Sequence, residues 1–142
     1  MLMAIAVLLI FVLVLLGILL FLSPGTPKPF LDDSGKPLAG SISEKIHVNI
    51  NGVEQGMFIQ GRNAGDPVLL YLHGGLPDHF LNDRYPTGLE EIFTIVWWEQ
   101  RGSGLSFHPD MVPESLNSEQ IVSDTLELTN YLRARFGQEK IY

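Results

Sequence analysis

The chain has 142 residues, the length of one ordinary domain at most, and a formal net charge of −7. This acidic balance argues against nucleic-acid binding, because neutralising phosphates requires a basic face and the sequence has no cluster of Lys and Arg. The absence of Cys excludes disulfides, zinc–thiolate sites and iron–sulfur clusters. The charges are unevenly distributed, since all 9 Lys and Arg and all 16 Asp and Glu follow residue 24.

Residues 1–22 form an apolar segment in which Gly17 is the only residue outside the hydrophobic class. A helix of this length rises roughly 30 Å, the thickness of the hydrocarbon core of a bilayer. We therefore expect a transmembrane anchor and a single-pass membrane localisation, with the side of the globular part left open. A cleaved signal peptide is the alternative, although the segment exceeds the usual apolar region and no basic residue precedes it.

Residues 23–41 follow as a segment rich in Pro and Gly. Its composition predicts a semi-extended linker with no core of its own. Residues 42–142 are expected to form the folded domain.

The first predicted elements of this domain form a hairpin. Residues 46–50 alternate between apolar and polar side chains, which is typical of a half-buried strand. The dipeptide Asn51-Gly52 follows, a strong signal for a type I′ turn. We expect the return strand over roughly residues 55–60.

Two continuous apolar runs, residues 68–72 and 93–98, predict buried strands. Strands that are apolar on both faces are typical of a parallel sheet covered by helices. Residues 78–91 between them predict a loop and a short, poorly marked helix. Strands that alternate with helices give an α/β fold class, in which a hairpin precedes parallel strands with helices.

The last predicted helix begins at Asn117 or Ser118 and ends before Gly137. Gln120 lies three residues after Asn117 and completes a capping box, and Gly is the usual residue after a helix. Residues 140–142 predict the opening of another strand. The helical spacing predicts a buried face of Ile121, Thr125, Leu128 and Leu132, widened by Val122, Leu126 and Phe136.

Two Gly-containing segments come directly after the predicted buried strands. His73-Gly74-Gly75 follows the first strand, and residues 99–106, with the sequence EQRGSGLS, follow the second. In parallel sheets, sites form at the carboxyl ends of the strands. A Gly turn there allows backbone N–H groups to point at a developing negative charge. A tight turn without a ligand explains the first segment equally well.

The two segments at this spacing resemble those of proline iminopeptidases, a branch of the serine peptidases with the α/β-hydrolase fold. That branch typically has HGGPG and DQRGSGRS. This chain has HGGLPD, in which Leu76 replaces Pro, and EQRGSGLS, in which Glu99 and Leu105 are the differences. The resemblance covers residues 42–142. It implies the N-terminal portion of an α/β-hydrolase sheet, here preceded by a transmembrane helix.

The resemblance also implies roles for individual residues. The backbone N–H of Gly75 or Leu76 would form half of an oxyanion hole, and the second segment would be a structural loop that Arg101 ties down through hydrogen bonds. It implies neither a metal nor an organic cofactor. The supporting residues that it implies are His73, Gly74, Gln100, Arg101, Gly102, Ser103 and Gly104.

The nucleophile of that family lies in a G-x-S-x-G elbow after the next strand. The nearest approach is residues 104–108, which end in His, so the catalytic Ser, acid and His are not found in this chain. We expect the N-terminal part of a membrane-anchored serine hydrolase, which acts on a small peptide or acyl substrate when complete and is inactive as this chain. The alternative is a non-catalytic membrane-tethered fragment or binding module.

Overall fold

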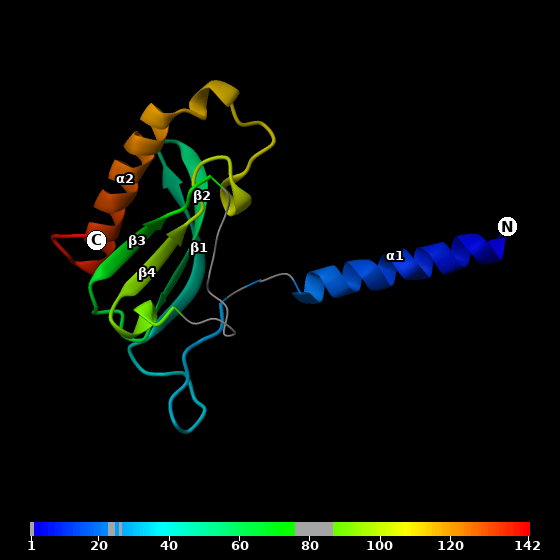
Figure 1. Ribbon diagram of the computed structural model, residues 1–142, viewed down its shortest axis with the longest axis horizontal. Coiled ribbons are helices and arrows are strands. Elements are labelled where there is room, and N and C mark those ends of the chain that lie inside the picture. Colours follow the sequence, from blue (N-terminus) through cyan, green and yellow to red (C-terminus); the bar gives the residue numbers. More distant parts are fainter. Residues whose placement is uncertain (1, 23–24, 26, 76–86) are drawn as a thin grey trace.

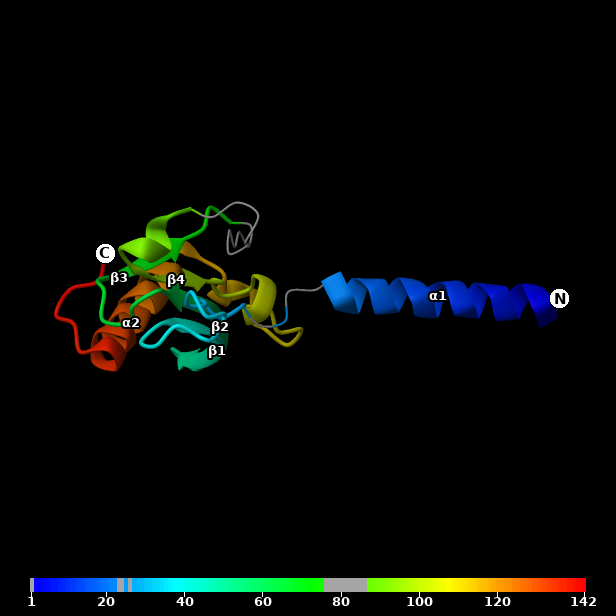
Figure 2. The ribbon, with the colours of Figure 1, turned by 90° about the horizontal axis from the view of Figure 1, so that it is seen from below.

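A computed structural model describes residues 2–22, 25, 27–75 and 87–142 (Figure 1). Three-residue 3-10 helices lie in the connections, η1 (Leu89–Glu91), η2 (Gly104–Ser106) and η3 (Pro113–Ser115). Figures 1 and 2 show α1 projecting away from the sheet and α2 lying along it. The main elements in chain order are α1 (Leu2–Leu22), β1 (Ile42–Ile50), β2 (Val53–Gly61), β3 (Val68–Leu72), β4 (Thr94–Trp98) and α2 (Ser118–Phe136).

The apolar segment forms α1, a helix of 21 residues. Within the part of the chain that the structure describes, no helix is long and apolar enough to cross a membrane. The predicted transmembrane anchor at residues 1–22 and the predicted single-pass membrane localisation are therefore wrong.

The sheet is small and mixed, with the strand order β1-β2-β4-β3. The pairs β1·β2 and β2·β4 are antiparallel, and only β3·β4 is parallel. The observed fold is thus a small α/β domain with a mixed four-stranded sheet. The predicted fold class, the N-terminal portion of an α/β-hydrolase sheet with a hairpin before parallel strands and helices, preceded by a transmembrane helix, is wrong. The apolar runs of β3 and β4 predicted that these strands are buried, but strand direction depends on contacts distant in sequence.

The positions of β4 and β3 in the sheet explain how far each strand is buried. β4 lies between β2 and β3, and all five of its residues are buried. β3 lies at the end of the strand order, so that Val68 is buried while Leu72 is 49% exposed. Central strands lose solvent on both edges and both faces, whereas an edge strand keeps one side open.

The predicted hairpin is confirmed. β1 and β2 pair along their whole length, with Ile50 opposite Val53 at the turn. Asn51 and Gly52 both have positive φ, 47° and 79°, which a type I′ turn requires at its two central residues.

Local signals also predicted the ends of α2 correctly. The Asn117 side chain accepts a hydrogen bond of 2.8 Å from the backbone N–H of Gln120. Gly137 ends the helix in the left-handed conformation, with φ of 64°. The predicted buried face is right at Leu128 and Leu132 and wrong at its border. The exposed fractions there are 70% for Val122 and 64% for Leu126.

The core lies on both faces of the sheet. One cluster joins β1, β2, β3 and β4 to α2 and includes Met57, Ile59, Val96 and Trp98 beside Leu128 and Leu132. A second cluster contains Phe58, Ile95 and Trp97. These residues alternate with those of the first cluster along β2 and β4, so the two clusters occupy opposite faces.

The chain before β1 folds back onto the hairpin. Ser43 Oγ donates a hydrogen bond of 2.6 Å to the carbonyl of Lys28. The guanidinium of Arg62 lies 5.5 Å from the centre of the Phe30 ring. Lys28 and Phe30 of the predicted linker therefore contact the domain, while residues 23–24 and 26 lie outside the described residues.

Two backbone hydrogen bonds connect the C-terminal residue to β3. Tyr142 donates to the carbonyl of Val68 at 2.9 Å, and Leu70 donates to the carbonyl of Tyr142 at 2.8 Å. This is the pattern of a parallel bridge opposite Leu69. The expected strand opening at residues 140–142 thus lies beside β3, on the edge that β4 does not use.

Candidate functional site

The two Gly-containing segments lie at the same edge of the sheet. His73 directly follows β3, and Glu99 directly follows β4. β3 and β4 are parallel neighbours with Leu72 opposite Trp98. Their carboxyl ends therefore meet, and both segments leave the sheet side by side.

His73 joins the two segments. Its backbone carbonyl accepts a hydrogen bond of 3.0 Å from the Gln100 side-chain amide. Its ring nitrogen Nε2 lies 3.1 Å from the backbone nitrogen of Gln100 and 3.1 Å from Ser103 Oγ. The residue is only 7% exposed. The structure thus brings three of the predicted supporting residues into one cluster.

Gly75 adopts a φ of 103°, a conformation that residues with a Cβ rarely occupy. Its N–H donates to His73 Nδ1 at 3.2 Å. A neutral imidazole has only one acceptor nitrogen. The ring therefore cannot accept from Gly75 and from Gln100 at the same time, and the tautomer of His73 decides which N–H it binds. The Nδ1-protonated tautomer releases the Gly75 N–H from the ring.

Gly74, the other glycine of the predicted oxyanion turn, shows no comparable constraint. Gly74 has open space where a Cβ would project, so crowding does not explain why this residue is glycine. Leu76, the second predicted donor, lies outside the described residues.

In the loop after β4, Gly102 and Gly104 both lie where a Cβ would clash with a neighbouring side chain. A Cβ on Gly102 would approach Leu116 Cδ2 to 2.8 Å, and its φ is 82°. A Cβ on Gly104 would collide with the carboxylate of Glu99. That carboxylate accepts a very short hydrogen bond from the backbone N–H of Leu105. The loop is therefore closely packed on itself.

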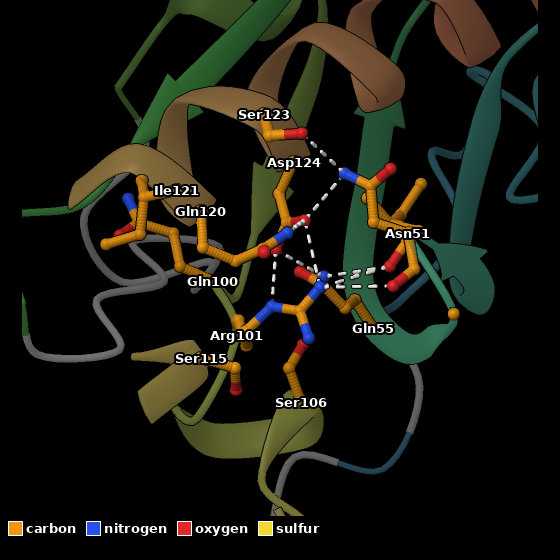
Figure 3. A network of polar contacts seen from close by, with 12 residues as sticks. Asn51, Gln55, Gln100, Arg101, Ser106, Ser115, Gln120, Ile121, Ser123 and Asp124 are labelled. Carbon is orange, nitrogen blue, oxygen red and sulfur yellow. Dashed lines mark hydrogen bonds and ion pairs between the residues drawn. The ribbon is translucent and has the colours of Figure 1, made fainter. Parts of the chain in front are cut away.

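Arg101 points into a buried network around Asp124, shown in Figure 3. Its Nε and Nη2 atoms contact the two carboxylate oxygens of Asp124 on α2, at 2.7 and 2.9 Å. Nη2 also approaches the carbonyl of Ile50 at 3.4 Å. The side chains of Arg101 and Asp124 are 4% and 0% exposed. Arg101 thus ties the loop to α2 and to the end of β1.

Three amide side chains complete the network around Asp124. Asn51 and Gln120 donate to Oδ1, each at 2.8 Å, and Gln55 donates to Oδ2 at 2.9 Å. Gln55 in turn accepts a hydrogen bond of 3.0 Å from the indole N–H of Trp98. The carboxylate therefore has five donors from four side chains.

Burial and hydrogen bonding act in opposite directions on Asp124. Burial raises the pKa of this carboxyl, but the hydrogen bonds from Arg101, Asn51, Gln120 and Gln55 outweigh it and hold the pKa below its ordinary value. Asp124 is therefore ionised at neutral pH. The pair is neutral as a whole, since the guanidinium keeps its charge at this pH.

The sequence analysis missed the role of Asp124, which it did not place on the buried face. Asp124 lies three residues after Ile121 and four before Leu128, within the apolar face of α2. A charge at such a position needs a buried partner. The position of Asp124 between Ile121 and Leu128 could therefore have indicated a buried, positively charged partner.

Ser106 is fully buried. Its hydroxyl accepts from the Gly56 N–H at 2.8 Å and donates a very short hydrogen bond to the carbonyl of Glu99. It is therefore a structural residue and is out of reach of a substrate.

An open cavity of about 340 Å³ lies next to Arg101, with Glu54, His108, Asp110 and Met111 among its lining residues. Among the residues described, no group of three His, Asp or Glu side chains is arranged to hold a metal ion.

Comparison with known proteins gives one informative relative. Over 108 residues, the chain is 35% identical to a protein of Bacillus subtilis (strain 168) named probable aminopeptidase YbaC. The match covers 75% of this chain and 34% of that protein, so the chain spans about a third of the length of this relative. No protein-family model and no solved structure matches the chain. The chain therefore has an aminopeptidase-like relationship.

Proposed function

We propose that this chain is the part of an aminopeptidase-type serine hydrolase that supplies the oxyanion turn. The complete protein removes an N-terminal residue from a small peptide, or cleaves a related acyl bond, in the manner of proline iminopeptidases. The relationship to a probable aminopeptidase supports the general class. The two Gly-containing segments support the finer assignment.

The observation that carries the proposal is the junction between these two segments. The Gln100 side-chain amide donates to the His73 carbonyl across the carboxyl ends of β3 and β4, and the Gln100 backbone nitrogen lies 3.1 Å from His73 Nε2. The Gly75 backbone, with its positive φ, is held next to this junction by the His73 ring. A rigid support of this kind suits a backbone donor that must meet a developing oxyanion without reorganising.

The chemistry divides between this chain and the rest of the protein. A serine hydroxyl attacks the substrate carbonyl carbon, and the oxyanion that forms is stabilised by backbone N–H groups. The C–N bond then breaks and the amine leaves with the proton taken from the serine. The 142 residues hold no G-x-S-x-G segment. The nucleophile, the acid and the base would therefore come from other parts of the complete enzyme.

A chimera tests the proposal. The 108 aligned residues of the Bacillus protein are replaced by those of this chain, and hydrolysis of proline and alanine p-nitroanilides is measured. We expect turnover, with proline preferred. Gly75→Pro removes the N–H and is expected to lower kcat by about 100-fold or more, with KM little changed.

Gly52→Ala is the matched control for backbone strain in this experiment. Gly52 also has a positive φ, 79°, and open space around it, but it lies in the hairpin turn. It should leave kcat unchanged, whereas Gly75→Ala should lower it. A folded chimera that is inactive on both substrates, while the Bacillus protein is active, contradicts the proposed function.

A further inference from the structure

Asp124 belongs to neither of the two Gly-containing segments, yet it is the central acceptor of the buried network in Figure 3. We propose that Asp124 is a positioning residue that acts through Arg101 to hold Gln100 against His73, and thereby sets the position of Gly75. The catalytic meaning of this inference rests on the proposed function. Its structural part can be tested without any activity.

The link from Arg101 to the turn is short. Gln100 precedes Arg101 in the chain, and a trans peptide holds their Cα atoms about 3.8 Å apart. Gln100 donates from its side-chain amide to the His73 carbonyl, and its backbone nitrogen lies 3.1 Å from His73 Nε2. In the tautomer with the proton on Nε2, the His73 ring accepts from the Gly75 N–H through Nδ1. A displacement of Arg101 therefore reaches Gly75 through two residues.

Gly56 anchors both ends of the loop. It accepts from the Glu99 backbone N–H at 3.0 Å and donates to the Ser106 hydroxyl at 2.8 Å. Loop residues between these anchors bond mainly to one another, as in the hydrogen bond from Ser103 to the Gln100 carbonyl. From α2, Asp124 fixes the middle of the loop through the two contacts of its carboxylate with Arg101.

A charge on Asp124 is needed because Arg101 is buried. Removing one partner of a buried ion pair leaves an uncompensated charge, which is strongly unfavourable. An Asn at position 124 would keep hydrogen bonding but not the charge. The guanidinium would then move toward water and carry Gln100 with it.

Two reporters separate the network from the turn. The Trp98 indole N–H reports on the network, because it bonds to Gln55, which bonds to Asp124. The backbone amides of Gln100 and Gly75 report on the turn. A perturbation that travels as proposed changes all three signals.

The test compares Asp124→Asn with Leu128→Ala in the full chain, purified in a mild detergent and followed by amide NMR and hydrogen exchange. Leu128 lies one turn further along α2, fully buried in the apolar core. Asp124→Asn should shift the amides of Gln100 and Gly75 and speed their exchange by about 10-fold more than Leu128→Ala at equal loss of thermal stability. Asp124→Glu, which keeps the charge, should return both amides toward wild type.

The inference is overturned if the two amides respond equally in Asp124→Asn and Leu128→Ala, if neither responds, or if the change stops at Gln100. Should Asp124→Asn fail to fold, Arg101→Lys replaces it, because it keeps the charge and loses the two-point contact. In the chimera, Asp124→Asn should lower kcat and leave KM nearly unchanged. A chimera without any activity would count against the proposed function alone, since the NMR result is independent of turnover.

Discussion

At the scale of single residues, the His73 ring has two alternative hydrogen-bond arrangements. Ser103 Oγ donates to the Gln100 carbonyl at 2.8 Å, so its lone pairs face His73 Nε2 at 3.1 Å. This favours a proton on Nε2 and leaves Nδ1 to accept from Gly75. Ser103→Ala removes the acceptor, and we expect the proton to move to Nδ1 as Nε2 accepts from Gln100.

Ring ¹⁵N chemical shifts of His73 measure this change directly. His108 serves as the internal control, because its Nε2 lies 2.8 Å from the Glu54 carbonyl, a partner that the substitution leaves in place. Its shifts should stay constant. An unchanged His73 tautomer in Ser103→Ala would show that the hydroxyl does not control the ring.

Asp124 predicts a pH dependence of stability. Its pKa is lowered in the folded state, so the stability that it contributes is present above its unfolded value of about 3.9 and is lost as the pH falls through the folded pKa. Asp124→Asn should lower the free energy of unfolding by about 3–5 kcal/mol at pH 7. The difference from wild type should narrow below about pH 4.

Asp32→Asn is the matched control for this acid titration by denaturant unfolding. The pKa of Asp32 is also lowered, mainly by the Ser34 hydroxyl, but Asp32 lies in an exposed turn. Its substitution should change the acid branch of the stability curve much less. Parallel curves for wild type and Asp124→Asn down to pH 2 would contradict the assignment.

At the scale of elements, α2 provides a matched pair of substitutions. Leu126 is 64% exposed and Leu128 is fully buried, two residues apart in the same helix. Leu128→Ala should lower the free energy of unfolding by about 2–5 kcal/mol, because it leaves a cavity. Leu126→Ala should stay within about 0.5 kcal/mol of wild type. Equal losses in urea unfolding would mean that the exposed side of α2 is covered in solution.

The elements that the sequence predicts well are those encoded by near neighbours. The turn at Asn51 and the helix cap at Asn117 each depend on residues at most three apart, and both are present. The edge position of β3 and the mixed sheet depend on pairing between residues tens of positions apart. The Arg101–Asp124 pair is of the same kind, since 23 residues separate its members. Hydrophobic periodicity therefore predicted the strands and α2, but it did not predict which strands pair or which side chains meet.

At the scale of the whole molecule, the chain corresponds to about a third of its Bacillus relative. We expect the chain alone to show no turnover of proline p-nitroanilide or of a p-nitrophenyl ester. The oxyanion turn stabilises a transition state only after a nucleophile has attacked. Ser106 cannot provide that nucleophile, because it is fully buried and both its donor and acceptor functions are in use.

Labelling with an active-site reagent tests more directly than a rate measurement whether the chain holds an activated serine. A fluorophosphonate reacts with activated serines and should leave the chain unlabelled while it labels the active chimera. Ser106→Ala and the exposed-turn variant Ser34→Ala should both leave the chain unlabelled and without turnover. Labelling of the isolated chain that disappears in Ser106→Ala would mean that the loop after β4 opens to expose its serine. Turnover by the isolated chain that disappears in Gly75→Pro would mean that these 142 residues already hold a complete catalytic site.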